Sequence, residues 1–265
     1  MPAATLQSTL SQEEKIEPVQ REASVPGTYV NFDRAEVVRV GGVRWRRLAL
    51  KTPLVHKGDD LSAILSEAAG PFLEEGDILV VTEKVVAIAQ GRAMPVSEIR
   101  PSGLARLLSR FVTRTPYGIG LAMPETMECA LRECGRGKIL IAAAAGAVGK
   151  LLGKKGWFYR VAGIQAAGID GPCACTIPPY NHWVVLSPQD PGREAEKLFH
   201  TLREEGYPLR AVVIADCNDL GGELIGQSGE VDLQLLREIL ADNPLGQGDD
   251  QTPAGIVRQS STDSL

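Results

Sequence analysis

Residues 76–81 read Gly-Asp-Ile-Leu-Val-Val, and their four consecutive apolar side chains decide the fold class. An unbroken apolar run of this length is typical of a strand that is buried on both faces of a sheet. Residues 211–215 form a similar run, which ends at Asp216. We therefore predict that both segments are buried strands.

Helix signals surround these two runs. Asp60, or its neighbour Asp59, can cap a helix that starts at Leu61, and Ser102 can cap another. Pro124 favours the start of a third helix. We further expect helices over residues 193–205 and 233–240, a hairpin over 37–50, and strands over 139–141, 183–186 and 255–258. This alternation of strands and helices predicts a mixed α/β architecture.

The composition is that of an ordinary folded protein. Of the 265 residues, 44% are hydrophobic and 23% are charged, close to the averages for globular domains. The polar segments 1–28 and 259–265 are expected to be disordered tails, which leaves residues 29–258 as the folded domain. The cysteines are odd in number and form no CxxC pair, which favours reduced thiols over a disulfide framework or a zinc ribbon.

Charge and hydropathy argue against several classes of partner. The net charge of −5 gives no general attraction to a nucleic-acid backbone. The N-terminal residues lack the pattern of a secretory signal, and no stretch reaches the roughly 20 apolar residues that span a bilayer. We expect no nucleic-acid partner, no membrane partner and a cytoplasmic location.

Common nucleotide and hydrolase motifs do not occur in the sequence. There is no GxxxxGK[ST], GxGxxG or GxSxG, and the histidines show no HExxH spacing. A standard P-loop and a zinc hydrolase are therefore not expected.

A polar loop over residues 216–222 follows the second apolar run. The carboxyl end of a strand is where open α/β sheets bind ligands. Asp216, Asn218 and Asp219 offer oxygen ligands that suit Mg²⁺ or Mn²⁺. The same residue types favour turns, so a metal site and a plain turn remain alternatives at this point.

Two further loops are rich in glycine. Residues 243–253 contain glycines that let backbone N–H groups approach an anion, with Asp249 and Asp250 to hold its metal. The alternative is a disordered linker, against which the strand-like residues 255–258 count. Residues 163–171 are small enough to admit a ligand. Charge alone adds Lys84, Lys154 and Lys155 as phosphate partners.

Several short segments lie in an order and spacing that carry a resemblance from about residue 50 to residue 258. They are Thr52-Pro53-Leu54-Val55, Gly58-Asp59-Asp60-Leu61, residues 76–82, Lys84-Val85-Val86, Gln90-Gly91-Arg92, Ala162-Gly163-Ile164, Val213-Ile214 with Asp216 and Asn218, and Gly246, Gly248, Asp250, Pro253 and Arg258. Together these segments resemble the coenzyme F-420 gamma-glutamyl ligase family, which joins glutamate to a deazaflavin precursor using GTP and divalent metal. The resemblance implies a mixed sheet flanked by helices, and a homodimer.

The resemblance also implies roles for individual residues. The implied nucleotide-binding set is Thr52, Pro53, Leu54, Val55, Glu83, Lys84, Gly246, Gln247, Gly248, Asp249 and Asp250. The implied metal set is Asp216 and Cys217, with Gln165 and Gln247 at the positions of further metal ligands. Asn218 and Asp219 are additional candidates beside them.

The chain departs from the family at several of these positions. Ile88 stands in place of Lys, Gln90 and Gln247 in place of Glu, Gln165 in place of a metal-binding Asp, Gly168 in place of Asn, and Cys217 in place of Thr. Amide oxygens replace carboxylate charge only weakly. We therefore expect metal binding to be weakened or relocated.

The resemblance implies a ligase that depends on GTP or ATP and on Mn²⁺ or Mg²⁺. It would add L-glutamate to the carboxylate of a small molecule, such as a deazaflavin coenzyme, through an acyl phosphate. A folate-type acceptor is one alternative. A non-catalytic module that binds a nucleotide or another ligand, and has lost its metal carboxylates, is another.

Overall fold

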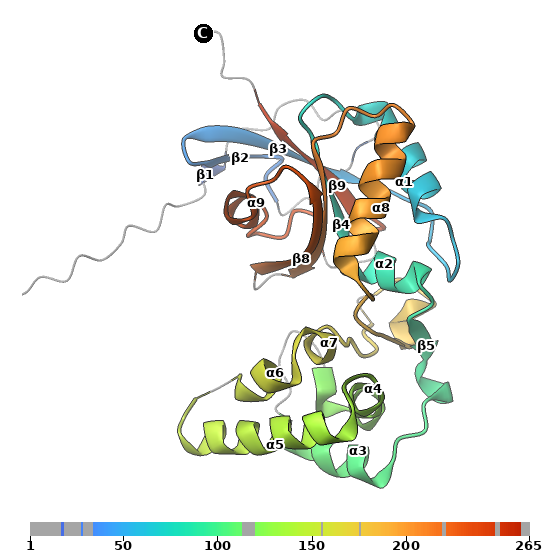
Figure 1. The fold of residues 1–265 in the computed structure, drawn as a ribbon, viewed down its shortest axis with the longest axis vertical. Coiled ribbons are helices and arrows are strands. Elements are labelled where there is room, and N and C mark those ends of the chain that lie inside the picture. Colours follow the sequence, from blue (N-terminus) through green and yellow to red (C-terminus); the bar gives the residue numbers. More distant parts are fainter. Residues whose placement is uncertain are drawn as a thin grey trace, which may run out of the picture.

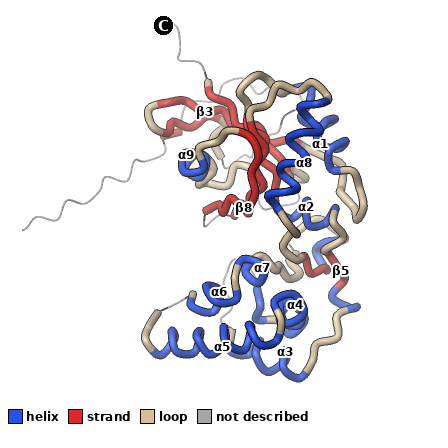
Figure 2. The backbone as a smooth tube through the Cα atoms, viewed as in Figure 1, coloured by secondary structure: helices blue, strands red, loops and turns tan. Residues whose placement is uncertain are grey.

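The computed structural model describes residues 17–18, 28, 34–112, 120–154, 156–174, 176–218, 221–246 and 250–260. Only the backbone is described at positions 17, 18, 218, 221 and 222. The chain forms two lobes, one built around a β-sheet and one built mainly from helices (Figure 1). Figure 2 shows most strands in the upper lobe and an almost wholly helical lower lobe. In the described part of the chain, no helix has the length and apolar character that crossing a membrane requires.

The sheet lobe contains a seven-stranded mixed sheet, as the sequence predicts. Its strands are, in spatial order, β1 (Glu17–Pro18), β2 (Val37–Val40), β3 (Val43–Leu50), β9 (Ala254–Gln259), β4 (Ile78–Thr82), β7 (Ala211–Asn218) and β8 (Gly221–Gly229). Strands β4 and β7 run parallel, and the other neighbouring strands run antiparallel. Strand β1 lies inside the predicted N-terminal tail, and β9 extends just beyond the predicted domain boundary at residue 258.

Helices cover both faces of this sheet because its central strands are apolar on both sides. Leu79 in β4 and Ile214 in β7 pack against α1 (Leu61–Ala69) and α8 (Pro191–Glu204). Val80 and Val213 face the other way and pack against α9 (Leu233–Ile239). Figure 1 shows α1 and α8 on one side of the sheet and α9 on the other. The prediction that both runs form strands buried on two faces is confirmed.

The helical lobe has a core of its own. Its helices are α3 (Gly103–Leu108), α4 (Pro124–Cys134), α5 (Arg136–Leu151), α6 (Trp157–Ala162) and α7 (Ile164–Ala167), with a small sheet of β5 (Ala93–Pro95) and β6 (Trp183–Val185). Short 3₁₀ turns lie at Gly70–Phe72, Val96–Glu98, Ser109–Phe111, Gly120–Ala122 and Tyr180–His182. Leu121, Met127 and Ile139 are fully buried at the centre of this lobe.

Two adjacent passages of the chain join the lobes. Helix α2 (Glu83–Ala89) follows β4 and leads out of the sheet lobe, and residues 186–190 lead back to α8. The side chain of Gln90 donates from Nε2 to the carbonyl of Gln189 at 3.1 Å and accepts from the Gln189 N–H at 2.8 Å. The backbone N–H of Leu186 donates to the carbonyl of Arg92 at 2.9 Å. The outgoing and returning segments are thus bonded to each other.

Local signals predicted most helix starts correctly. The carboxylate of Asp60 accepts hydrogen bonds from the N–H groups of Ser62 and Ala63 at the start of α1. Ser102 caps α3 in the same way, and α4 begins at Pro124. The hairpin over residues 37–50 is also confirmed, because β2 and β3 pair in register around its turn.

Four predictions from the sequence are wrong. Residues 139–141 form part of helix α5 rather than a strand, because a run of alanines follows them and alanine is the strongest helix former. Residues 216–218 and 221–222 belong to a β-hairpin rather than a loop, and residues 164–167 form α7. Cys173 is disulfide-bonded, which the cysteine count did not suggest, whereas Cys129, Cys134 and Cys217 are free.

Candidate active site at the edge of the sheet

One edge of the sheet gathers several of the predicted site segments. Thr82 at the end of β4 lies opposite Ala215 in the parallel strand β7, so the next residues, Glu83 and Asp216, emerge side by side. Strand β9 runs the opposite way between β3 and β4, with Ala254 paired to both. The residues that follow β3 and β4 and those that precede β9 therefore meet at this edge.

Backbone hydrogen bonds hold these segments together. The N–H of Thr52 donates to the carbonyl of Gln251 at 3.1 Å, and the N–H of Thr82 donates to the carbonyl of Pro253 at 2.8 Å. The predicted nucleotide segments at residues 52–55, at 83–84 and just before β9 are thus neighbours in space. Their binding of a nucleotide stays a prediction.

Lys84 connects this edge to the helical lobe. Its ammonium nitrogen lies 2.5 Å from Oε1 of Glu83, 2.9 Å from the carbonyl oxygen of Gly168 and 2.9 Å from Oδ2 of Asp170. Burial alone would lower the pKa of Lys84, but the carboxylates of Asp170 and Glu83 outweigh it and raise the pKa. Lys84 is therefore a permanent cation at the junction of the lobes.

Glu83 is an acid in an unusual environment. Its side chain is only 2% exposed, and burial raises its pKa to about 7. Lys84 opposes this rise, while the charges of Asp216 and Asp170 add to it. A carboxyl group with a pKa near 7 exchanges its proton readily at neutral pH, which is a common property of functional sites.

Gly168 provides the space that the Ser187 hydroxyl occupies beside Glu83. A Cβ atom at position 168 would lie 3.3 Å from both carboxylate oxygens of Glu83 and 2.2 Å from Oγ of Ser187. The Ser187 hydroxyl is buried and lies 3.4 Å from the carbonyl oxygen of Ile164 and 3.5 Å from that of Gln165. The predicted metal-site residue Gln165 is thus near the junction, although its side chain is exposed.

Asp216 and Cys217 lie at the end of β7, as predicted. Burial raises the pKa of the Cys217 thiol to about 12, and the charges of Asp216 and Glu83 contribute to the rise. A protonated thiol is a poor ligand for Mg²⁺ or Mn²⁺, which prefer oxygen. We therefore expect Asp216, rather than Cys217, to bind a metal.

The donor chemistry at this edge suits a hard cation. Carboxylate and carbonyl oxygens predominate, and Mg²⁺ is commonly held by one or two carboxylates together with substrate phosphates. No group of three or more His, Cys, Asp or Glu side chains in the described ranges is arranged to hold a metal by itself. Asp250 lies in the segment before β9 and can serve as a second acid.

Other predicted residues fall elsewhere or cannot be placed. Lys154 follows α5 at the end of the helical lobe that is remote from α2, with its ammonium 6.0 Å from the ring of Trp157 (Figure 1). The structure does not bring it to the sheet edge. Gly246 lies in the turn after α9, where its N–H donates to the carbonyl of Asn243. Lys155, Asp219, Gln247, Gly248, Asp249 and the side chain of Asn218 lie outside the described residues.

Two departures from the family have structural explanations. Ile88 packs against the core between the sheet and α1, where a lysine would be unfavourable. Gln90 both donates to and accepts from the backbone of Gln189, which a glutamate carboxylate cannot do. Both residues therefore serve the fold.

Sequence reasoning did not assign Asp170 or Ser187 to the site. Asp170 lies in the small-residue loop that was singled out as a possible ligand site, but nothing in the sequence connects it to Lys84. Ser187 carries no motif at all. Its position in the returning passage between the lobes is visible only in the fold.

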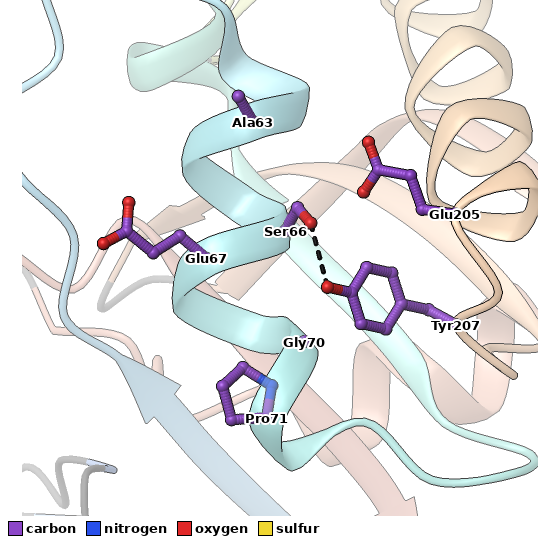
Figure 3. Close-up of a pocket in the computed structure, with 7 residues that line it drawn as sticks. All are labelled: Ala63, Ser66, Glu67, Gly70, Pro71, Glu205 and Tyr207. Atoms are coloured by element: carbon purple, nitrogen blue, oxygen red, sulfur yellow. Dashed lines mark hydrogen bonds between the residues drawn. The ribbon is translucent and has the colours of Figure 1, made fainter.

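A separate hollow of about 660 Å³ lies between α1 and the residues that follow α8 (Figure 3). Its lining residues are Ala63, Ser66, Glu67, Gly70, Pro71, Glu205 and Tyr207. The ring of Tyr207 packs against Gly70, and its hydroxyl accepts a hydrogen bond from Ser66 at 3.0 Å. None of the predicted site residues lines it.

Comparison with known proteins supports the resemblance seen in the sequence. The family model described as F420-0:Gamma-glutamyl ligase matches residues 49–222. A coenzyme F420:L-glutamate ligase of Methanopyrus kandleri is 28% identical over 231 residues, which cover 77% of this chain and 82% of that protein. Proteins of the same name from Methanothermobacter thermautotrophicus and Archaeoglobus fulgidus are each 26% identical over 78% of this chain, which corresponds to 85% and 84% of their own lengths. The family match spans the edge residues from Thr52 to Asp216, and this chain belongs to the F420-0:gamma-glutamyl ligase family.

Proposed function

We propose that this protein is a nucleotide- and metal-dependent ligase that joins L-glutamate to the carboxylate of a deazaflavin coenzyme-like acceptor. The relatives named above support the glutamate ligase class. The observation that carries the finer proposal is the meeting of Thr52, Glu83, Lys84 and Asp216 at one edge of the sheet. Such an edge at the carboxyl ends of strands is the usual ligand position in α/β folds.

Each residue at the edge has a role in this proposal. Lys84, held by two carboxylates and a carbonyl, would contact the phosphates of GTP or ATP. Asp216, with Asp250 as second acid, would hold Mn²⁺ or Mg²⁺. The cation would neutralise negative charge on the phosphates during their transfer.

The reaction would proceed in two steps. An oxygen of the acceptor carboxylate attacks the terminal phosphorus, which gives an acyl phosphate and the nucleoside diphosphate. The amine of L-glutamate then attacks the acyl carbon, phosphate leaves, and the amine loses a proton. Fixed positive charge at this edge stabilises both transition states.

Phosphate release measures this activity directly. The purified chain is incubated with GTP or ATP, Mn²⁺ and L-glutamate, and with either a deazaflavin precursor or a folate as acceptor. Release of phosphate that requires both the acceptor and glutamate supports the proposal, and the two acceptors distinguish it from the folate-type alternative. If a nucleotide raises the thermal stability of the chain without a metal, and no phosphate is released with either acceptor, the non-catalytic module is supported instead.

We also propose that the chain works as a homodimer in the cytoplasm, with α5 in the interface. The outer face of α5 exposes large apolar side chains, among them Ile141 at 65% and Leu151 at 87% exposure. A helix that is apolar on all sides is typically buried in the working protein.

Sedimentation analysis tests the dimer. We expect the wild-type chain to sediment as a dimer and an Ile141→Arg/Leu151→Arg variant as a monomer. A Lys197→Glu variant changes an exposed charge on α8 and should stay dimeric. A wild-type monomer at micromolar concentration would contradict this part of the proposal.

A further inference from the structure

Glu83 has features that its assignment to the nucleotide set does not explain. It is the first residue of α2, yet its side chain is almost fully buried against the helical lobe. Oε1 accepts a hydrogen bond from Lys84 at 2.5 Å. A buried carboxylate is costly unless cations or hydrogen-bond donors compensate for its charge, so a second cation beside Glu83 would be stabilised.

The surroundings of Glu83 are short of positive charge. Its ammonium neighbour is Lys84, whereas Asp216 follows Ala215 in the adjacent parallel strand and Asp170 lies on the far side of the same ammonium group. Lys84 is shared, because its ammonium also contacts Asp170 and the carbonyl of Gly168. One ammonium group thus serves several acceptors, and a second cation would be stabilised here.

The Glu83 carboxylate lies in a closely packed place. The absence of a side chain at Gly168 leaves room for the Ser187 hydroxyl, and a Cβ atom there would also lie 3.3 Å from both oxygens of Glu83. The backbone of Gly168 has a φ of −83°, so the glycine is not needed for an unusual conformation. Its function at this position is to leave space.

We propose that Glu83 is a divalent-cation ligand, which binds the metal together with Asp216 across the parallel pair of strands β4 and β7. Two carboxylates from adjacent strand ends, completed by nucleotide phosphates, form a set of ligands that Mg²⁺ and Mn²⁺ commonly use. This inference rests on the proposed nucleotide site, and it moves the main carboxylate of the metal site to the end of β4. Lys84 remains beside the cation as the phosphate contact.

Direct measurement of Mn²⁺ binding tests this assignment. The full chain is titrated with Mn²⁺, alone and with GTP, and free Mn²⁺ is followed by electron paramagnetic resonance. We expect Glu83→Gln to weaken Mn²⁺ binding by about tenfold or more, since even indirect partners of a metal commonly cost that much. Circular dichroism establishes that the variant is folded, and Glu83→Asp, which keeps the charge but shortens the side chain, should bind Mn²⁺ more weakly than wild type.

Asp170→Asn is the matched control. Asp170 is the other carboxylate bound to Lys84, so its substitution disturbs Lys84 without removing the proposed ligand. We expect Mn²⁺ affinity to change by no more than about threefold, the effect of one exposed charge nearby. Equal losses in the two variants would mean that Glu83 only holds Lys84, and the inference would be wrong.

The outcomes separate this inference from the proposed function. Mn²⁺ affinity that depends on Glu83, without glutamate ligation, keeps the cation site and contradicts the ligase. Glutamate ligation by wild type, with unchanged Mn²⁺ affinity in Glu83→Gln, keeps the ligase and overturns the assignment of Glu83. A wild-type chain that binds no Mn²⁺, alone or with GTP, also overturns it. Anomalous diffraction from a Mn²⁺-soaked crystal should place the ion about 2.1 Å from a Glu83 oxygen.

Discussion

Lys84 and Asp170 form an ion pair between the two lobes, with the ammonium nitrogen 2.9 Å from Oδ2 of Asp170. Lys84 belongs to α2 at the edge of the sheet, whereas Asp170 follows α7 in the helical lobe. The pair fixes the ammonium at the junction, where the segments at residues 52–55 and 250–253 also converge. A rigidly held cation loses little entropy when it binds an anion.

Loss of this cation should weaken nucleotide binding. We expect Lys84→Met to reduce affinity for GTP or ATP by about tenfold or more, because hydrogen bonds to charged groups contribute about 1.5–3 kcal/mol. Isothermal titration calorimetry measures the change. Lys154→Met is the matched control, since Lys154 lies at the remote end of the helical lobe, and its affinity should equal that of wild type. Equal affinities for all three proteins would contradict the role of Lys84.

Arg258 should be important for stability rather than for binding. Its guanidinium donates from Nε and Nη2 to the two oxygens of Asp77 at 2.8 Å each, and Asp77 is fully buried. Removal of one partner from a buried pair costs about 3–5 kcal/mol. We expect Arg258→Met to lower the free energy of unfolding in urea by about 3 kcal/mol. Lys197→Met, which removes an exposed ion pair with Glu194, should change it by less than about 1 kcal/mol.

A methyl group at position 168 should be poorly tolerated. Gly168→Ala places a Cβ atom 2.2 Å from Oγ of Ser187, so we expect a loss of about 1–3 kcal/mol in the free energy of unfolding. Ser187→Ala in the same chain should restore part of the loss. Gly192→Ala is the control, because no atom lies within 4 Å of its added Cβ, and this variant should be at least as stable as wild type. Identical unfolding midpoints for Gly168→Ala and wild type would contradict the packing.

The Cys217 thiol should react slowly in the folded protein. Its pKa of about 12 leaves a thiolate fraction at pH 8 that is roughly a thousandfold smaller than that of an ordinary cysteine. We expect iodoacetamide to label Cys217 slowly in the native chain and rapidly in guanidinium chloride, as followed by peptide mass spectrometry. Comparable rates in both solvents would show that the thiol is neither buried nor shifted.

The elements that were predicted correctly are those that nearby residues determine. The apolar runs in β4 and β7 are stable only when both faces of the strand are buried, and Asp60 and Ser102 cap helices through their own side chains. Helix α5 was missed in part because Ile139, Leu140 and Ile141 resemble a strand, while the alanines after them determine the helix.

The site was predictable where the chain order determines it. Asp216 follows the buried run 211–215 of β7, and Glu83 follows β4, so the parallel pairing of these strands brings them together. Asp170 and Ser187 could not be placed from sequence, because they reach Lys84 and Gly168 only through the way the helical lobe packs on the sheet edge. Gly168 was recognised as a departure from the family, but the Ser187 side chain that fills its space comes from the returning segment at residues 186–190.

The Gln90–Gln189 contact has a consequence for how relatives of this protein can diverge. It bonds the outgoing chain to the returning chain, so the whole helical lobe is inserted into the sheet lobe at a single point. An insertion whose two ends lie together can be lengthened, shortened or exchanged without altering how the strands pair. Relatives that share this sheet can therefore differ greatly in the helical lobe, while the edge where β4 and β7 end stays the same.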